Sequence, residues 1–128
     1  MISLFISALV DGRQPKIYGD GEHTRDFTYV ANVVDGVLKA CHAPKASGEV
    51  INVATSGRIS LNHLFATVRD LVGAKVEPVY AAPRAGDVKD SQADITKARE
   101  LLGYTPIVSF EDGLKHTVEW YRSSMTTA

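Results

Sequence analysis

Two arginines in this sequence stand close to carboxylates in segments without a helical pattern. Arg25 precedes Asp26 in GDGEHTRDFTYV, and Arg84 lies three residues before Asp87 in APRAGDVKDSQAD. Surface ion pairs contribute only about 0–1 kcal/mol each, so stability is a weak reason for either pair. A guanidinium group matches a phosphate, and two arginines from separate loops can hold a pyrophosphate from opposite sides. Surface ion pairs and an anion site therefore both stay open.

Other kinds of site have less support from the residue types. GDGE resembles part of a calcium loop but lacks the alternating oxygen ligands and the closing glutamate, so a turn is the better interpretation. No Ser lies in a G-x-S-x-G turn, and Cys41 falls on the apolar side of a predicted helix, where we expect it to be buried. No pair at ligand spacing in a helix occurs among His23, His42, His63 and His116.

Composition indicates a folded domain without a large net charge. The chain has 128 residues, 45% of them hydrophobic and 23% charged, and its net charge is -1. This balance disfavours nucleic acid and anionic membranes as partners, so an anion site must be local. One cysteine fits a reducing compartment, and we expect a cytoplasmic protein. The apolar start, MISLFISALVDG, is too short to cross a bilayer and lacks the features of a signal peptide.

The elements that must position the two arginines follow from periodicity. Helices are predicted before Gly12 and over 31–41, 61–72, 95–102 and 110–122. Their expected N-terminal caps are Asn32, Ser60, Asp94 and the Ser109–Asp112 capping box.

Short strands are predicted around Ile17 and over 25–30, 48–54 and 75–81. The stretch 82–94 has neither period and is long for a plain connection, which favours a functional loop. Strands that alternate with helices predict a small α/β or α+β fold.

Four stretches in order give the chain a family resemblance: PKIYGDGEHTRDFTYVANVVDG, GEVINVATSGRISLNHLF, PRAGDVKDSQADITKARELLGYTP and FEDGLKHTVEWY. Together they resemble the C-terminal part of the NAD-dependent epimerase/dehydratase family, the extended short-chain dehydrogenases/reductases. The loop over 83–94 is most similar to that of 4-epimerases acting on UDP-glucose or UDP-N-acetylglucosamine. The resemblance implies that residues 1–128 form a single nucleotide-sugar-binding domain, a small mixed sheet with helices, without the Rossmann half.

The resemblance also implies roles for individual residues. The family's two phosphate-binding arginines fall on Arg25 and Arg84. Its aspartate that holds the ribose hydroxyls falls on Asp87, and its aromatic residue that lies on uracil falls on Tyr18. These roles suit the residue types, because carboxylates accept hydroxyl donors and a flat ring stacks on a base for about 1–3 kcal/mol.

Further positions add detail and two departures from the family pattern. Lys16 and Ile17 are implied to supply backbone contacts to the nucleotide. Ser91 stands where some epimerases have a tyrosine near the sugar, and Asn32 stands where many members have an aspartate. UDP binding is implied, and the identity of the sugar stays open.

No stretch matches the family's Rossmann half, which binds NAD and carries the catalytic Tyr-x-x-x-Lys. The sequence also has no G-x-G-x-x-G turn after a strand to hold a dinucleotide. The implied activity of the intact enzyme is NAD-dependent 4-epimerisation of a UDP-sugar. We expect this chain to hold the UDP, to carry no catalytic residue, NAD or metal, and to be inactive alone.

Two alternatives stay open. The first is a nucleotide-sugar dehydratase or decarboxylase of the same family. The second is a non-catalytic interaction domain, because the helix matching 31–41 packs on the Rossmann half in the family and its apolar stripe would be exposed here. Through that face we expect the chain to form a homo-oligomer.

Overall fold

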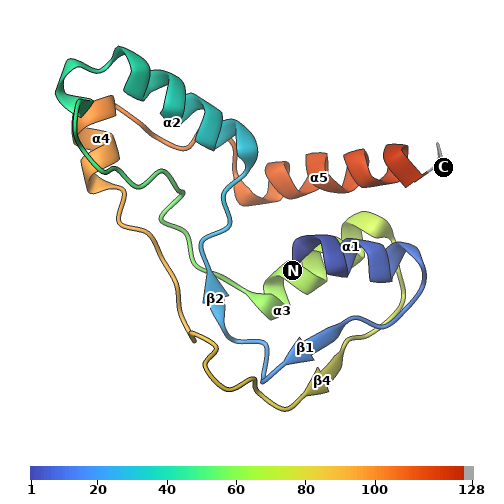
Figure 1. Cartoon of the computed structure of the whole chain (residues 1–128). Coiled ribbons are helices and arrows are strands. Elements are labelled where there is room, and N and C mark those ends of the chain that lie inside the picture. Colours follow the sequence, from blue (N-terminus) through green and yellow to red (C-terminus); the bar gives the residue numbers. More distant parts are fainter. Residues whose placement is uncertain (126–128) are drawn as a thin grey trace.

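The structure, a computed structural model, describes residues 1–125, which form five α-helices, a 3-10 helix and four short strands (Figure 1). The elements are α1 (Ile2–Val10), β1 (Lys16–Tyr18), β2 (Thr24–Arg25), α2 (Val30–His42), η1 (Pro44–Ala46), β3 (Ile59–Ser60), α3 (Leu61–Val72), β4 (Val79–Ala81), α4 (Thr96–Leu102) and α5 (Phe110–Met125). All five predicted helices are confirmed.

The strands of the described residues form two separate pairs. β1 and β4 are parallel, with Lys16 opposite Val79, whereas β2 and β3 are antiparallel, with Thr24 opposite Ser60. The expected class, a small mixed α/β structure, is confirmed.

Three predicted strands are wrong or too long. The stretch 48–54 is not a strand, of 25–30 only Arg25 belongs to one, and of 75–81 only Val79–Ala81 does. An extended segment needs a neighbouring backbone to become a strand, and no strand of the described residues pairs with 48–54. Val50, in the middle of this segment, keeps 86% of its surface exposed.

The first hydrophobic core joins α1, α3 and α5 over β1. Its buried members are Phe5, Ile6, Leu9, Ile17, Leu61, Leu64, Phe65, Val68, Leu114 and Val118. The rings of Phe5 and Phe65 meet edge to face at 6.1 Å between centroids. The helix caps that begin α3 and α5 are the predicted ones, with Ser60 accepting from His63 and Ser109 from Asp112. This core forms the rigid base beneath β1.

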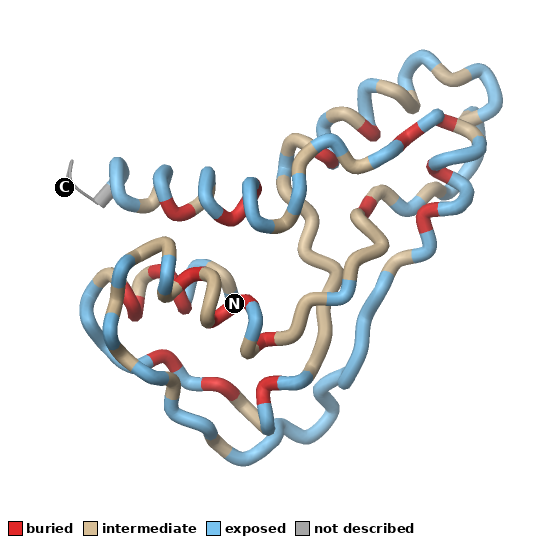
Figure 2. The backbone as a smooth tube through the Cα atoms, turned by 180° about the vertical axis from the view of Figure 1, so that it is seen from behind, coloured by how far each residue is buried: buried red, intermediate tan, exposed pale blue. Residues whose placement is uncertain are grey.

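A second, smaller core lies under α2 and α4, at the opposite end of the molecule from the first core (Figure 2). It contains Ala54, Ile95, Ala98, Leu102 and Tyr104, and the hydroxyl of Tyr104 donates to the carbonyl of Ala54 at 2.9 Å. Extended segments, not regular elements, connect this end to the first core (Figure 1).

The predictions for two residues of α2 were wrong, namely that Cys41 is buried and that Asn32 caps the helix. Cys41 is exposed, because the side of α2 that faces the protein is the one with Asn32 and Gly36. Asn32 is not the cap, since the helix begins two residues earlier. It is fully buried, accepts from the backbone of Ile107 and Val108, and donates to the carbonyl of Val108.

Candidate functional site

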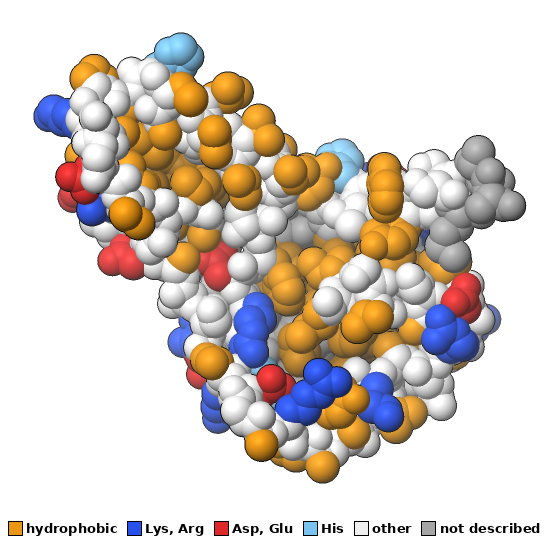
Figure 3. Space-filling model, in the orientation of Figure 1, with side chains coloured by type: hydrophobic (Ala, Val, Ile, Leu, Met, Phe, Trp, Pro, Cys, Tyr) orange, Lys and Arg blue, Asp and Glu red, His pale blue; other side chains and the backbone are white. Residues whose placement is uncertain are grey.

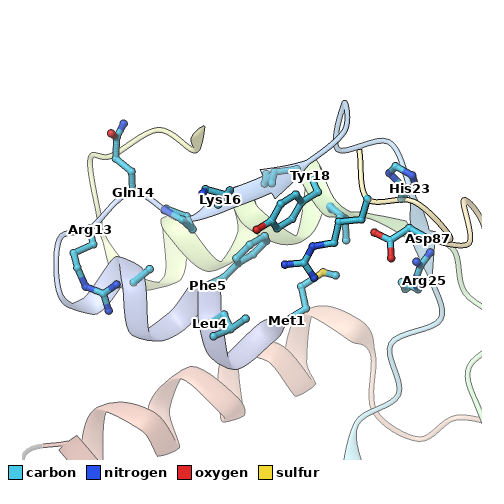
Figure 4. A pocket seen from close by; sticks show the side chains of 15 residues that line it. Met1, Leu4, Phe5, Arg13, Gln14, Lys16, Tyr18, His23, Arg25 and Asp87 are labelled. Atoms are coloured by element: carbon cyan, nitrogen blue, oxygen red, sulfur yellow. The ribbon is translucent and has the colours of Figure 1, made fainter. Parts of the chain in front are cut away.

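One cavity of about 500 Å³ lies between α1, β1 and the loop after β4 (Figure 4). Its floor is apolar and comes largely from Leu4, Phe5 and Ala8 of α1, while its polar groups come from β1, β2 and the loop. A concave site with an apolar floor and a few convergent polar groups is typical of small-molecule binding.

Six predicted site residues line this cavity, and one does not. Those that line it are Lys16, Ile17, Tyr18, Arg25, Arg84 and Asp87. Ser91 lies outside it and contacts β2 through its backbone, whose N–H donates to the carbonyl of Thr24 at 3.1 Å. The structure thus brings together residues that are up to 71 positions apart in the sequence, from Lys16 to Asp87 (87 − 16).

The turn from β1 to β2 depends on glycine. Gly21 has a φ of +77°, and a Cβ there would lie 2.0 Å from the side-chain oxygen of Asn62. Asn62 fills that space, donates to the carbonyl of Asp20 and accepts from the hydroxyl of Tyr80. The turn is therefore fixed against α3 and β4, which sets the positions of Tyr18 before it and Arg25 after it.

Arg25 enters the cavity from β2 and is held by backbone carbonyls. Its Nη1 donates to the carbonyls of Thr24 at 2.8 Å and Lys89 at 3.2 Å. Within residues 1–125 no carboxylate lies within 4.0 Å of either Arg25 or Arg84, so the surface ion-pair interpretation is wrong for both. Both guanidinium groups keep their charge available to an anion.

Arg84 lies over the ring of Tyr18, with its Cζ 3.8 Å from the ring centroid. This is a cation–π contact at an exposed position. Hydrogen bonding to Arg84 and the charge of Arg84 lower the pKa of the Tyr18 phenol, and Lys16 lowers it slightly further. The arginine of the loop and the aromatic residue of β1 therefore form one unit on the same side of the cavity.

The cavity is positively charged although the whole chain is not. Four basic side chains and a single carboxylate line it: Arg13, Lys16, Arg25, Arg84 and Asp87. Of these, Arg13 is paired with Asp11 at 2.7 Å. Figure 3 shows this face as a hydrophobic hollow bordered by basic side chains. The remaining excess of positive charge suits a ligand with at least two negative charges.

Two contributions to the cavity were missed by sequence reasoning. His23 lies beside Asp87 and Arg25 at one end (Figure 4), packed on the Gly19 turn. The apolar floor from α1 was also missed. Its signal was Leu4, which is at helical spacing with the core residues but stays 71% exposed.

Asp26 is the third missed feature. Its carboxylate accepts from the N–H and hydroxyl of Thr55, from the N–H of Ser56 and from the N–H of Ala93. It does not pair with Arg25, although the two are neighbours in the sequence.

The described residues offer little for other chemistries. In residues 1–125 no three His, Cys, Asp or Glu side chains come together in a way that suits a metal ion. No helix in that range has the length and hydrophobicity needed to cross a bilayer.

Known proteins resemble this chain in sequence and in fold. The family model for GDP-mannose 4,6 dehydratase matches residues 1–117. UDP-glucose 4-epimerase of Mycolicibacterium smegmatis is 40% identical over 123 residues, which cover 96% of this chain and 39% of that protein.

Two solved structures show the same fold. The Thermotoga maritima UDP-glucose 4-epimerase with UDP-glucose has 41% identity and a TM-score of 0.91 over 97% of this chain and 40% of that one. The Bacillus cereus UDP-glucuronic acid 4-epimerase with UDP-glucuronic acid and NAD has 30% identity and a TM-score of 0.88, over 96% and 40% of the two chains. The present chain thus spans about two fifths of the length of these relatives. On these matches it belongs to the NAD-dependent epimerase/dehydratase family of extended short-chain dehydrogenases/reductases.

Proposed function

We propose that this chain is the substrate-binding part of an NAD-dependent UDP-sugar 4-epimerase and that its cavity holds the UDP. One observation carries the proposal: two arginines that form no ion pair within residues 1–125, an aromatic ring and a carboxylate line a single cavity of about 500 Å³. The family membership supplies the nucleotide sugar as the class of ligand.

Each side chain has a task in this proposal. Arg25 and Arg84 bind the two phosphates from opposite elements, β2 and the loop after β4. Asp87 accepts the ribose hydroxyls, and the ring of Tyr18 stacks on the uracil. Lys16 and Ile17 contribute backbone contacts along β1, and Ser91 is a prediction for the sugar side. Held in this way, the sugar is oriented for reaction at its C4.

We place NAD outside this chain. The residues of this chain do not form an NAD site, since the sequence has no glycine-rich turn that could bind a dinucleotide. NAD, when bound in an intact family member, supplies the hydride chemistry. The residues described here bind and orient the nucleotide, and we expect no turnover from the chain alone.

Two unpartnered surfaces support a function within a larger assembly. Along α2, Val33, Val34, Val37 and Leu38 are between 39% and 57% exposed, which confirms the predicted exposure of this stripe. The extended segment 48–54 has no strand beside it in the described residues. Apolar and unpaired backbone surfaces of this kind are typical of faces that pack against another domain or subunit.

Isothermal titration of UDP tests the site. Wild type is compared with Arg25→Ala and Arg84→Ala, and Arg99→Ala serves as the control because Arg99 carries the same charge but does not line the cavity. Each charge-assisted contact contributes about 1.5–3 kcal/mol, so either cavity variant should weaken binding about 10- to 100-fold. Added salt should also weaken binding to wild type. Equal heats for wild type and both cavity variants would exclude the assignment.

A nucleotide-sugar dehydratase or decarboxylase is the second candidate, favoured by the dehydratase family model that matches residues 1–117. Parallel titrations with UDP, GDP and dTDP separate the substrate classes on this chain. Tighter binding of GDP than of UDP would favour a GDP-sugar enzyme over the epimerase.

A further inference from the structure

The carboxylate of Asp26 joins three segments that are far apart in the sequence. It is half-buried and accepts from Thr55 N at 3.2 Å, from the Thr55 hydroxyl, from Ser56 N at 2.9 Å and from Ala93 N at 3.3 Å. Three of these donors, from Thr55 and Ser56, precede β3, and the fourth lies at the end of the loop that carries Arg84. A carboxylate that only oriented the neighbouring Arg25 would not need four donors from other segments, so Asp26 has a different role.

The same segment of the loop is bound to β2 by backbone contacts. Thr24 N donates to the carbonyl of Lys89 at 3.0 Å, and Ser91 N donates to the carbonyl of Thr24 at 3.1 Å. Arg25 adds its Nη1, also to the carbonyl of Lys89. Residues 89–93 are therefore fixed along β2, with Asp26 at the end of this row of contacts.

The other end of the loop is fixed by β4, which pairs with β1 and reaches Ala81. The stretch between the two anchors is 82–88, which contains Arg84 and Asp87. Because both ends are held, the contacts that anchor residues 89–93, including the one from Ala93 to Asp26, limit where Arg84 can lie relative to Tyr18.

The backbone conformation of Ser56 indicates that its hydrogen bond to Asp26 is structurally important. Ser56 has a φ of +59°, in the left-handed region that few residues other than glycine adopt. Such a conformation costs of order 1–3 kcal/mol and persists only where the surroundings enforce it. The N–H of Ser56 donates directly to Asp26, so the carboxylate is part of what holds this conformation.

We propose that Asp26 is a positioning residue of the nucleotide site: its carboxylate anchors the loop 82–93 beside β2 and so aligns Arg84 with Arg25 across the cavity. The expected effect on UDP binding rests on the proposed function, whereas the anchoring of the loop by Asp26 is independent of it. Asparagine has only one acceptor oxygen and would turn an amide donor either toward the N–H and hydroxyl of Thr55 or toward the N–H groups of Ser56 and Ala93. Asp26→Asn should therefore release the loop.

The experiment has one readout with UDP and one without ligand. Titration should show about a tenfold loss of UDP affinity in Asp26→Asn, equivalent to 1.4 kcal/mol. In the free protein, the Nε–Hε NMR resonance of Arg84, assigned with Arg84→Lys, should lose the ring-current shift that Tyr18 causes. Thr55→Val removes one donor and keeps the backbone, so it should give a smaller change of the same kind if Asp26→Asn does not fold.

Two controls separate positioning from general loss of stability. Asp94→Asn makes the same change of charge next to Ala93, but the carboxylate of Asp94 accepts from the N–H of Thr96 at the start of α4, whose N-cap is Ile95 and not the predicted Asp94. Thr117→Val removes a hydrogen bond inside α5, from the Thr117 hydroxyl to the carbonyl of Gly113, which involves neither the loop nor the segment that bonds to Asp26. Both should keep the Arg84 resonance and the UDP affinity of wild type.

An unchanged Arg84 resonance in folded Asp26→Asn and Thr55→Val would overturn the inference. If wild type does not bind UDP while Asp26→Asn still moves the resonance, the proposed function fails and the anchoring role stands.

Discussion

At the scale of single residues, the contact between Arg84 and Tyr18 is the most informative feature of the cavity. In the free protein the guanidinium lies on the ring that we assign to the uracil, at 3.8 Å from its centroid. UDP binding in the proposed mode transfers Arg84 from the ring to a phosphate and leaves one face of the ring to the base. The ligand therefore exchanges a cation–π contact for a stacking and an ionic contact.

This exchange predicts a pH dependence with a defined sign. Arg84 lowers the pKa of Tyr18 in the free protein. Bound phosphates neutralise Arg84 and bring negative charge near the phenol, so they raise the pKa again. UDP then binds less tightly as the pH rises through the lowered pKa of the free protein, because the phenolate must take up a proton.

Titration of UDP at increasing pH, up to the ordinary tyrosine pKa of about 10, checks this prediction. Tyr18→Phe should remove the part of the pH dependence that belongs to the phenol, and Tyr121→Phe, outside this cavity, should leave it unchanged. Identical pH profiles for wild type and Tyr18→Phe would contradict the proposed position of the ring beside the ligand.

At the scale of elements, Asn32 connects α2 with the chain between α4 and α5. It is buried, and its amide makes three hydrogen bonds to the backbone of Ile107 and Val108, at 2.8 to 2.9 Å. The amide supplies both an acceptor and a donor, which a carboxylate cannot do. This explains why an uncharged residue fits the position here.

Asn32→Asp should therefore destabilise the fold. The variant places an acceptor against the carbonyl of Val108 and buries a charge, which together cost about 2–4 kcal/mol. Urea unfolding followed by circular dichroism measures the loss. Asn52→Asp is the matched control, because Asn52 is exposed and makes one long contact to Asp94, and its loss should stay below about 1 kcal/mol.

The sequence predictions are accurate where the interacting residues are close together in the sequence and fail where they are far apart. Helices α1, α3 and α5 were predicted because their apolar spacing and caps, such as Ser60 and Ser109, lie within a few residues. The strand at 48–54 was predicted wrongly because strand formation requires a partner distant in the sequence. Asn32 was assigned as a cap for the same reason, since its three partners lie about 75 residues away.

At the scale of the whole molecule, the two cores have different surroundings. The first is enclosed by three helices, whereas the second leaves the apolar side of α2 uncovered (Figure 3). Val37 and Leu38 are 54% and 57% exposed. A continuous apolar face of this kind favours contact with a second copy of the chain at high concentration.

We expect the 128-residue chain to self-associate through α2. Val34→Lys combined with Val37→Lys places two like charges on the face and should shift the chain to a monomer, because charged side chains cannot be buried unpaired. Light scattering after size exclusion measures the mass. Ile107→Lys adds charge at another exposed apolar residue and should leave the association intact. A wild type that stays monomeric at millimolar concentration would refute the prediction.

The sequence by itself determined the helices, the turn glycines and the family, because these depend on residues close together or on motifs in a given order. It also indicated the candidate nucleotide-binding side chains, namely Arg25, Arg84, Asp87 and Tyr18. Only the tertiary structure decided that Arg25 and Arg84 have no carboxylate partner among the described residues and that Arg84 lies on Tyr18. It also decided that the carboxylate of Asp26 accepts from Ser56 and Ala93 and does not pair with Arg25. These facts depend on contacts between residues 29 to 67 positions apart, which local chemistry does not specify.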